Sequence, residues 1–404
     1  MKIYIIFYTL LAGLLLTGCS DMNSLHQEYI DRGEAIYTGV VDSLKAYPGM
    51  YRARFEWMLQ ADPRITKVEI TWRERGTQKA AEVAVNRTEN GAFHMEHILE
   101  NLPEGAISFE FVTRDAEGHR SLSASNTTTV LGSDYEQNLQ PRKATALKFL
   151  YDVNDYSIAW GSIDSKLTRC VVSYETAAGG KTEITVLPSE TATVLTNAKT
   201  EGKYVVVSYF NAGIDEVSKT SAEQTLPPKP LQRTYWEFPG YNANSSDGTR
   251  GYDSQEIKEG NVNAPDNGRV MAMLDGDAST FWHSSWEPET PYPHWFIVNL
   301  NRKTEIHGVM LQRRQGDTRT SKGYYLYTCE SEPTDPDDPV DGYNWEYQGD
   351  FPFNPNSDDE QTAWLQQSFP KARYVKIYFD EAKHKGESVF SMFAEFALYG
   401  TVLE

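Results

Sequence analysis

Cysteine is scarce in this sequence: among 404 residues there are three, Cys19, Cys170 and Cys329. The last two belong to different predicted domains, so a disulfide between them is not expected, although an oxidising envelope would permit one. Basic residues are also in deficit, because 38 Lys and Arg face 57 Asp and Glu and leave a formal net charge of -19. Such a chain repels phosphate backbones, and this excludes nucleic acid as a partner.

The motifs of several enzyme classes are missing as well. The sequence contains no nucleophile elbow, no Walker loop, no dinucleotide fingerprint and no His-Glu-x-x-His zinc motif. His94 and His97 lie close together, but their spacing misses the zinc-protease pattern. A glycosidase that uses two carboxylates stays open, since carboxylates are plentiful in an acidic chain.

Long apolar runs are limited to the N-terminus. Lys2 precedes an almost continuous apolar run at residues 3–16, which is short for a membrane span and typical of a signal-peptide core. The Leu-Thr-Gly-Cys that ends at Cys19 resembles the lipobox of bacterial lipoproteins. That resemblance implies a signal peptide at 1–18, cleavage before the cysteine and acylation of Cys19. The residues that follow are polar, and they predict a tether, so that the lipidated cysteine and its tether occupy 19–34. The alternative is an ordinary signal peptide that contains a cysteine.

The residues after Cys19 bear on localisation. Ser20 and Asp21 resemble the surface-export signal of Bacteroidota lipoproteins, although Met22 and Asn23 interrupt its usual acidic run. The resemblance implies an outer membrane lipoprotein exposed at the cell surface. Each buried methylene of a lipid chain contributes ~0.8 kcal/mol, so several acyl chains on one residue make a durable membrane anchor.

Beyond the tether, apolar and polar residues alternate. They switch at every step in residues 51–57, and the same alternation recurs at 67–72 and at 107–111. Period two predicts strands with one solvated face. Turn signals such as Asn-Leu-Pro-Glu-Gly at 101–105 separate these strands, so we expect an antiparallel sandwich at 35–133.

The pattern then repeats. Trp57 and Trp72 are 15 residues apart, and Trp160 and Tyr174, at the ends of two similar strands, are 14 apart. We therefore expect a second, related sandwich at 141–226. Both segments resemble immunoglobulin or fibronectin type III modules. As a tandem pair behind a lipobox, they resemble an uncharacterised family of Bacteroidota lipoproteins.

A Pro-rich hinge at 227–234 separates these modules from a third domain at 235–404. Four ordered blocks of this domain resemble discoidin domains, also called coagulation factor 5/8 type C domains: residues 272–284, 293–300, 373–377 and 394–400. The resemblance implies an eight-stranded jelly-roll sandwich of the group that includes family-32 carbohydrate-binding modules. The whole chain is therefore predicted to be all-β. An acidic, Pro-rich stretch at 330–339 predicts a solvated loop inserted in this domain.

The resemblance also implies a structural Ca²⁺ site. Asp275 and Asp277, with Thr280 nearby, place hard oxygens on one tight loop, and such a cation takes six to eight of them. The ligand set that the resemblance implies combines side chains and backbone carbonyls of Ala272, Asp275, Asp277, Thr280, Ala394 and Glu395. The alternative is an acidic turn without metal, capped by its own hydrogen bonds.

A sugar site is implied in the same way. His283 and Trp286, followed by Arg314 and Gln315, resemble the ligand loops of galactose-type family-32 modules. An aromatic face covers the C–H face of a pyranose, while fixed polar groups select its hydroxyls. The family's discriminating acidic residue is not clearly matched, since Asp266 and Asn267 occupy that region. The alternatives are a buried hydrogen-bonded His283, a loop-anchoring Trp286 and an Arg314 that merely pairs with a carboxylate.

These features together predict a non-enzymatic surface lipoprotein that captures glycan through its C-terminal domain. The three sandwiches account for nearly all of the chain and leave no catalytic domain. The expected partners are a glycan or glycoconjugate, the membrane through the lipid anchor, and a protein of a glycan-uptake complex. The alternatives are an adhesin or scaffold that binds a protein with the same domain, and a glycan-active enzyme.

Overall fold

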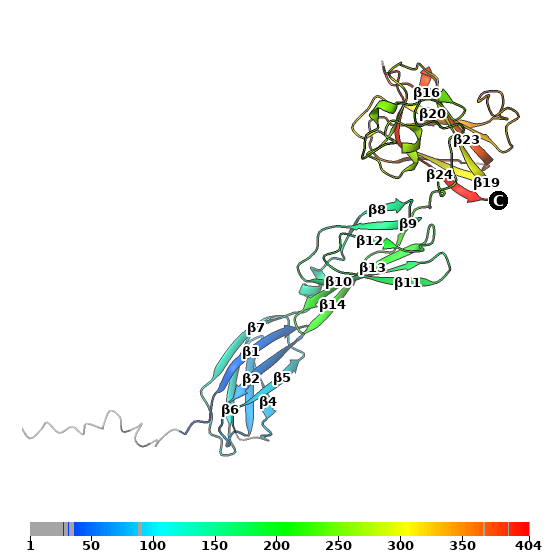
Figure 1. The fold of residues 1–404 in the computed structure, drawn as a ribbon. Coiled ribbons are helices and arrows are strands. Elements are labelled where there is room, and N and C mark those ends of the chain that lie inside the picture. Colours follow the sequence, from blue (N-terminus) through cyan, green and yellow to red (C-terminus); the bar gives the residue numbers. More distant parts are fainter. Residues whose placement is uncertain are drawn as a thin grey trace, which may run out of the picture. The chain divides into compact units, whose positions relative to one another are not determined.

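The computed structural model describes Gln27, Asp31 and residues 36–87, 91–366, 368–386 and 388–403. The predicted signal peptide, Cys19 and nearly all of the predicted tether lie outside these residues. Within them the chain is almost entirely β (Figure 1), as the alternating pattern predicted. No helix in this part of the chain is long and apolar enough to cross a membrane.

The chain divides into two compact units. The first consists of Met1–Gln140, Lys166–Thr168 and Tyr209–Lys219, and the second of Pro141–Ser165, Arg169–Ser208 and Thr220–Glu404.

The first sandwich has two antiparallel sheets, ordered β1-β2-β5 and β4-β3-β6-β7. Buried side chains alternate along β2, so Phe55 and Trp57 point into the core. There they meet Phe109 and Phe111 of β6, with ring centroids 4.7 to 5.4 Å apart. The strands are β1 (Val41–Gly49), β2 (Arg52–Leu59), β3 (Lys67–Glu74), β4 (Thr77–Ala84), β5 (Phe93–Glu100), β6 (Gly105–Arg114) and β7 (Ala124–Val130).

The second sandwich follows the short helix α3 (Ser133–Gln137) and repeats this strand order, as β8-β9-β12 and β11-β10-β13-β14. Its core also uses alternate residues, with Tyr156 and Trp160 on β9 and Cys170 and Tyr174 on β10. Cys170 and Cys329 are both free and buried. The strands are β8 (Ala144–Leu150), β9 (Asp155–Trp160), β10 (Leu167–Glu175), β11 (Lys181–Val186), β12 (Ala192–Leu195), β13 (Lys203–Ala212), β14 (Asp215–Thr220) and β15 (Gln224–Thr225), of which β15 pairs with β13.

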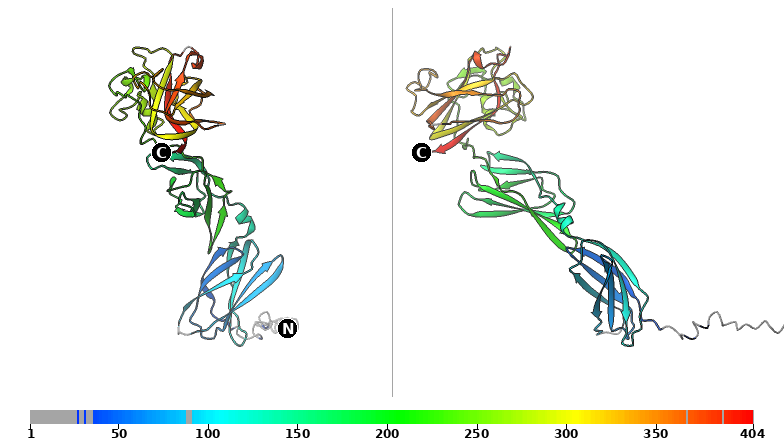
Figure 2. Two further views of the ribbon diagram at one scale, coloured as in Figure 1. Left: turned by 90° about the vertical axis from the view of Figure 1, so that its right-hand side faces the viewer. Right: turned by 180° about the vertical axis from the view of Figure 1, so that it is seen from behind.

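The C-terminal domain contains strands β16 to β24, which Figure 2 shows from two further sides. One run of neighbouring strands has the order β16-β17-β19-β23-β20-β21, while β22 and β24 pair with β19, and β18 pairs with β24. The strands are β16 (Asp247–Thr249), β17 (Tyr252–Ser254), β18 (Trp282–His283), β19 (His294–Arg313), β20 (Gly323–Cys329), β21 (Glu346–Pro352), β22 (Gln361–Trp364), β23 (Lys371–Phe379) and β24 (Met392–Val402). Three 3₁₀ turns complete it: η1 (Ile257–Glu259), η2 (Val270–Leu274) and η3 (Glu381–Lys383).

Strand β19 joins the two layers of this domain. The sequence predicted a strand only at 293–300, but β19 continues to Arg313 past a register shift between Asn299 and Thr304. Its first part pairs with β23, and its second part pairs with β24 and β22. Trp282 lies fully buried between the layers, edge-on to Phe296 at 5.6 Å and stacked on Phe393 at 6.4 Å. The core therefore fixes β18, and with it the loop that follows.

Candidate functional site

The predicted sugar-binding residues lie on loops that begin where strands end. His283 is the last residue of β18, and Trp286 follows it in the loop; Arg314 comes directly after the end of β19. His283 also contacts Phe390, which precedes β24, with ring centroids 5.1 Å apart. Three segments that are distant in sequence therefore meet at one end of the sandwich.

His283 is 1% exposed. Burial, helped by the nearby guanidinium of Arg314, lowers the pKa of its imidazole to about 4. The ring is therefore neutral at physiological pH. Its Nδ1 lies 2.5 Å from the backbone oxygen of Ser284. Because a carbonyl oxygen can only accept, Nδ1 carries the proton and Nε2 carries a lone pair.

Two aromatic side chains flank this imidazole. Trp286 meets it edge to face, at 4.7 Å and an interplanar angle of 88°. Trp286 and Phe390 are both half-buried, so each keeps part of its ring accessible. Phe390 also lines a hollow of about 580 Å³, together with Glu289 and Arg319.

Arg314 lies on the neighbouring loop. Its guanidinium is 4.0 Å from the centre of the Phe281 ring, and its Nη1 is 3.6 Å from a carboxylate oxygen of Glu259. The side chain is 27% exposed, so the guanidinium keeps donors directed to solvent. Gln315 is exposed, and no hydrogen bond joins it to another residue in the described ranges.

Of the two adjacent arginines, Arg314 is the one that faces solvent, because Arg313 is held in the interior. The Arg313 side chain is buried and donates to the backbone oxygens of Ser357, Arg314 and Asp317. Its Nη2 also lies 2.6 Å from a carboxylate oxygen of Asp358. Arg313 thus holds the loop in place, and the next residue turns outward.

The structure thus brings His283, Trp286 and Arg314 to one end of the domain and leaves Gln315 without a hydrogen bond to any residue that it describes. Sequence reasoning missed Phe390 and Arg319 at the same end. Phe390 stands shortly before the predicted closing strand, but no local pattern connects it to His283. Asp266 accepts a long hydrogen bond, 3.4 Å, from the Tyr241 hydroxyl. Sugar binding by these residues stays a prediction.

The predicted calcium ligands lie around the turn after η2. One carboxylate oxygen of Asp275 accepts from the Asp277 backbone N–H at 2.8 Å, and the other accepts from the Thr280 hydroxyl at 2.6 Å. The Thr280 hydroxyl also lies 2.9 Å from the Asp277 backbone oxygen. Gly276 permits the turn, with a φ of 81°. The Ala272 backbone oxygen faces the same turn, 3.4 Å from the Asp275 N–H.

Strand β24 supplies the remaining predicted ligands. Ala394 and Glu395 are both buried. Arg233, a residue of the predicted hinge that sequence reasoning did not single out, contacts Oε2 of Glu395 at 2.5 Å. The other carboxylate oxygen, Oε1, is buried without a hydrogen-bond partner in the described part of the chain. Burial raises the pKa of Glu395 to about 7 despite Arg233, and it also raises the pKa of Asp275.

These residues fit a calcium ion. A buried carboxylate oxygen without a donor is costly, and a hard cation is a natural partner for it. Asp275 and Glu395 are close enough that each charge raises the other's free energy, because the Asp275 charge contributes to the raised pKa of Glu395. A bound Ca²⁺ would offset this repulsion and tie the turn after η2 to β24. Calcium binding stays a prediction.

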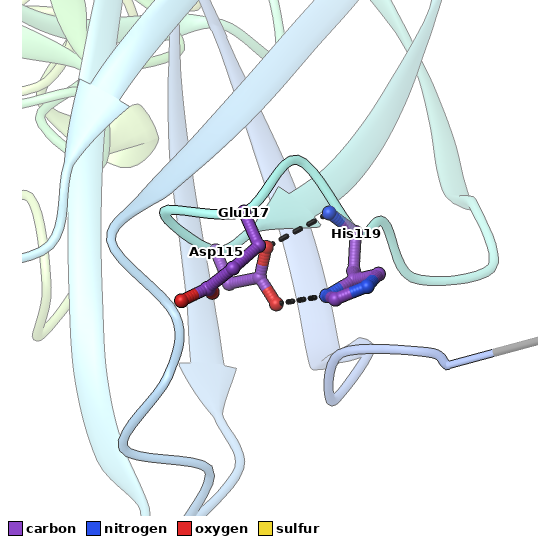
Figure 3. Close-up of side chains that lie close together, drawn as sticks. All are labelled: Asp115, Glu117 and His119. Carbon is purple, nitrogen blue, oxygen red and sulfur yellow. Dashed lines mark hydrogen bonds and ion pairs between the residues drawn. The ribbon is translucent and has the colours of Figure 1, made fainter.

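A smaller cluster lies in the first sandwich. Asp115, Glu117 and His119 place ligand atoms within 4.8 Å of one another (Figure 3). Asp115 accepts from the His119 backbone N–H at 2.8 Å and contacts its Nδ1 at 2.7 Å. These bonds close the turn after β6 and account for the arrangement without a ligand.

Two parts of the chain match models of known protein families. Residues 254–396 match the family model of the F5/8 type C domain, and residues 19–216 match that of a domain of unknown function. Over 68 residues, 16% of this chain, the sequence is 35% identical to a sialidase of Micromonospora viridifaciens. That match spans only 10% of the sialidase.

Two solved structures are similar to the C-terminal part. One is the C-terminal domain of a chitobiase from Bacteroides fragilis, with which this chain shares 24% sequence identity. The match covers 44% of this chain and 100% of that domain, with a TM-score of 0.34. The other is a CBM32 domain from Clostridium perfringens in complex with GalNAc-β-1,3-galactose. It shares 20% identity, covers 36% of this chain and 94% of its own, and has a TM-score of 0.28.

Proposed function

We propose that this chain, whose residues 254–396 belong to the F5/8 type C family, binds carbohydrate without catalysis through the end of that domain. The observation that carries the proposal is the state of His283. It is neutral, it is held by Ser284, and it lies between the rings of Trp286 and Phe390. The Nε2 lone pair is therefore a fixed acceptor beside two apolar faces.

This arrangement suits a sugar ring. The accessible part of Trp286 can cover the C–H face of a pyranose, which apolar rings favour. A hydroxyl of the same ring can donate to Nε2 of His283, and Arg314 can donate to the oxygens on its other side. Because Arg314 is partly paired with Glu259, the site carries little net charge, and a neutral sugar suits it.

Sugar binding by this chain is proposed to take place at a membrane. If Cys19 is acylated as the lipobox implies, the chain is an outer membrane lipoprotein that displays its C-terminal domain at the cell surface. One small solvated sugar gives a weak complex, with a Kd on the order of 0.1 to 1 mM, or about 4 to 5.5 kcal/mol. Many tethered copies that engage one polymer would retain it far better than one copy does. Such a protein would capture glycan for a neighbouring protein of an uptake complex.

A glycan array tests this function. The chain from Ser20 onward is applied, with GalNAc-β-1,3-galactose among the immobilised glycans because it is the ligand in the Clostridium perfringens structure. We expect binding by the wild type and at least a tenfold loss with Arg314→Ala. Arg314 is partly exposed, so this variant should stay folded. An array without any bound glycan would sink the proposal.

A further inference from the structure

A second hollow, of about 690 Å³, lies elsewhere in the C-terminal domain, and it shares no lining residue with the hollow at Phe390. Its walls come from the segment after the hinge, from the turn before β17, from β23 and from the acidic insertion that follows β20. A volume of this size is typical of a small-molecule site. The residues that define its chemistry are Trp236, Glu237, Tyr241, Arg250, Tyr343 and Tyr374.

The insertion at residues 330–339 forms one wall of this hollow. Its composition predicted only a solvated loop, but hydrogen bonds and an ion pair hold it in place. Its Thr334 is bound to the backbone oxygen of Gly342 through both N–H and hydroxyl, at 2.7 and 3.0 Å. Glu332 accepts from the Tyr374 hydroxyl at 2.6 Å and pairs with Arg373 at 2.5 Å. The insertion is therefore fastened to β23, and the hollow has a fixed shape on that side.

Aromatic rings from separate segments line this hollow. Tyr343 is 5% exposed and lies edge-on to Tyr374, with centroids 5.2 Å apart. Trp236 is 9% exposed and packs on Phe396 at 5.9 Å. Tyr241 is half-buried and presents part of its ring. Trp236 and Tyr343 are nearly buried in the lining, so Tyr241 is the ring that can present an apolar face to a ligand.

Two charged side chains at the hollow keep unused hydrogen-bonding capacity. Glu237 is oriented by Asn299, whose Nδ2 donates to Oε1 at 2.9 Å. Oε2 of Glu237 has no hydrogen bond to any residue that the structure describes. Arg250 uses Nη1 to bind Asp337 at 3.0 Å, and no described residue accepts from its Nε or Nη2. One carboxylate acceptor and a set of guanidinium donors therefore remain for a ligand.

We infer that this hollow is a second carbohydrate site, which binds a neutral sugar unit against the ring of Tyr241 while Glu237 and Arg250 bind its hydroxyls. The inference rests on the proposed function for its ligand class, but on none of the same residues. The opposite charges of Glu237 and Arg250 favour a ligand that is uncharged and both donates and accepts. A domain with two sites would hold one glycan polymer more strongly than either site alone.

Saturation-transfer NMR on the full chain tests the inference, with galactose, N-acetylgalactosamine, glucose and mannose as probes. The proteins compared are wild type, Trp286→Ala, Glu237→Gln, two double variants that combine Trp286→Ala with Glu237→Gln or with Arg250→Ala, and Glu346→Gln. Glu237→Gln keeps the size of the side chain but removes the carboxylate, and Arg250→Ala removes the donors independently. Glu346→Gln is the matched control, because this exposed glutamate on β21 does not line the hollow.

We expect saturation transfer to persist in Trp286→Ala and to fall to the level without protein in the double variant with Glu237→Gln. Arg250→Ala combined with Trp286→Ala should give the same loss, and Glu346→Gln should give none. If Trp286→Ala alone abolishes all transfer, the second site does not exist and the proposed function stands. If Trp286→Ala changes nothing and Glu237→Gln removes all transfer, the hollow is the sugar site and the proposed function at His283 is wrong. Unchanged transfer in both double variants overturns the second site.

Discussion

The guanidinium of Arg233 lies 2.5 Å from Oε2 of Glu395, and neither side chain is more than 5% exposed. This buried ion pair joins the segment after the hinge to the closing strand β24. Removing Arg233 leaves the Glu395 carboxyl buried without its ion-pair partner, and burying that group uncompensated costs more than the pair itself gains. We predict that Arg233→Ala lowers the free energy of unfolding by about 3 to 5 kcal/mol, measured by urea denaturation.

A matched control distinguishes this loss from that of any arginine or lysine. Lys258 pairs with Glu287 at 2.5 Å, but both side chains are more than half exposed. Solvent and salt screen such a pair, so Lys258→Ala should change stability far less. An equal decrease in the free energy of unfolding of the two variants would show that the buried Arg233–Glu395 pair stabilises the fold no more than an exposed pair does.

Calcium should stabilise the C-terminal domain. An ion that binds only the folded state raises the free energy of unfolding by about 2.7 kcal/mol at a hundred times its Kd. We predict that added Ca²⁺ raises the melting temperature and that a chelator lowers it, and that Asp275→Ala abolishes both effects. Asp277→Asn should retain them, because the resemblance assigns that residue a backbone oxygen as ligand. A melting temperature that changes neither with added Ca²⁺ nor with chelator would show that these residues do not bind calcium.

The depressed pKa of His283 predicts an unusual pH dependence. An exposed histidine loses its neutral form near pH 6.5, but burial lowers the pKa of His283 to about 4. Protonation therefore favours the unfolded chain, and the contribution of His283 to stability is lost as the pH falls from 6.5 towards 4. Sugar affinity should stay constant between pH 8 and pH 5 and fall only near 4, where Nε2 becomes protonated. Calorimetric titration with the sugar across this pH range measures the affinity. A loss of affinity centred near pH 6.5 would contradict the prediction that His283 is buried and neutral.

The membrane anchor depends on one residue. We predict that Cys19→Ala leaves the chain without lipid and moves it from the membrane fraction to the soluble fraction, because the acyl chains supply the membrane affinity. Cell fractionation with immunoblotting measures this directly. Cys170→Ala is the control, since that cysteine is buried in the second sandwich and should leave the fractionation unchanged. A Cys19→Ala chain that remains in the membrane fraction would end the lipoprotein proposal.

Period-two patterns made the strands predictable. Phe55, Trp57, Trp160 and Tyr174 are core residues of strands with one solvated face, so their alternation is visible in the sequence. The F5/8 type C domain was likewise identifiable, because its motifs lie on short contiguous stretches, and the family match confirms it. Within its motif, Trp282 is a core residue, as a jelly roll requires.

Contacts between distant segments were not predictable. Arg233 and Glu395 are 162 residues apart, and only the closure of the sandwich brings the segment after the hinge against β24. Phe390 reaches His283 for the same reason, through the loop that leads into β24. The outward turn of Arg314 depends on Arg313, whose hydrogen bonds reach loop atoms around Ser357. Two adjacent arginines cannot be told apart by sequence when the partners of one lie in another loop.

The contribution of Trp286 to sugar binding is the most direct test of the proposed function. Wild type and Trp286→Ala are titrated calorimetrically with the glycan that scores on the array, and their melting curves are compared. We predict that the variant loses at least tenfold in affinity at the His283 site while its melting temperature stays unchanged, because Trp286 is a partly exposed loop residue that meets His283 edge to face. Wild-type affinity in a folded Trp286→Ala chain would show that this end of the domain does not bind the sugar.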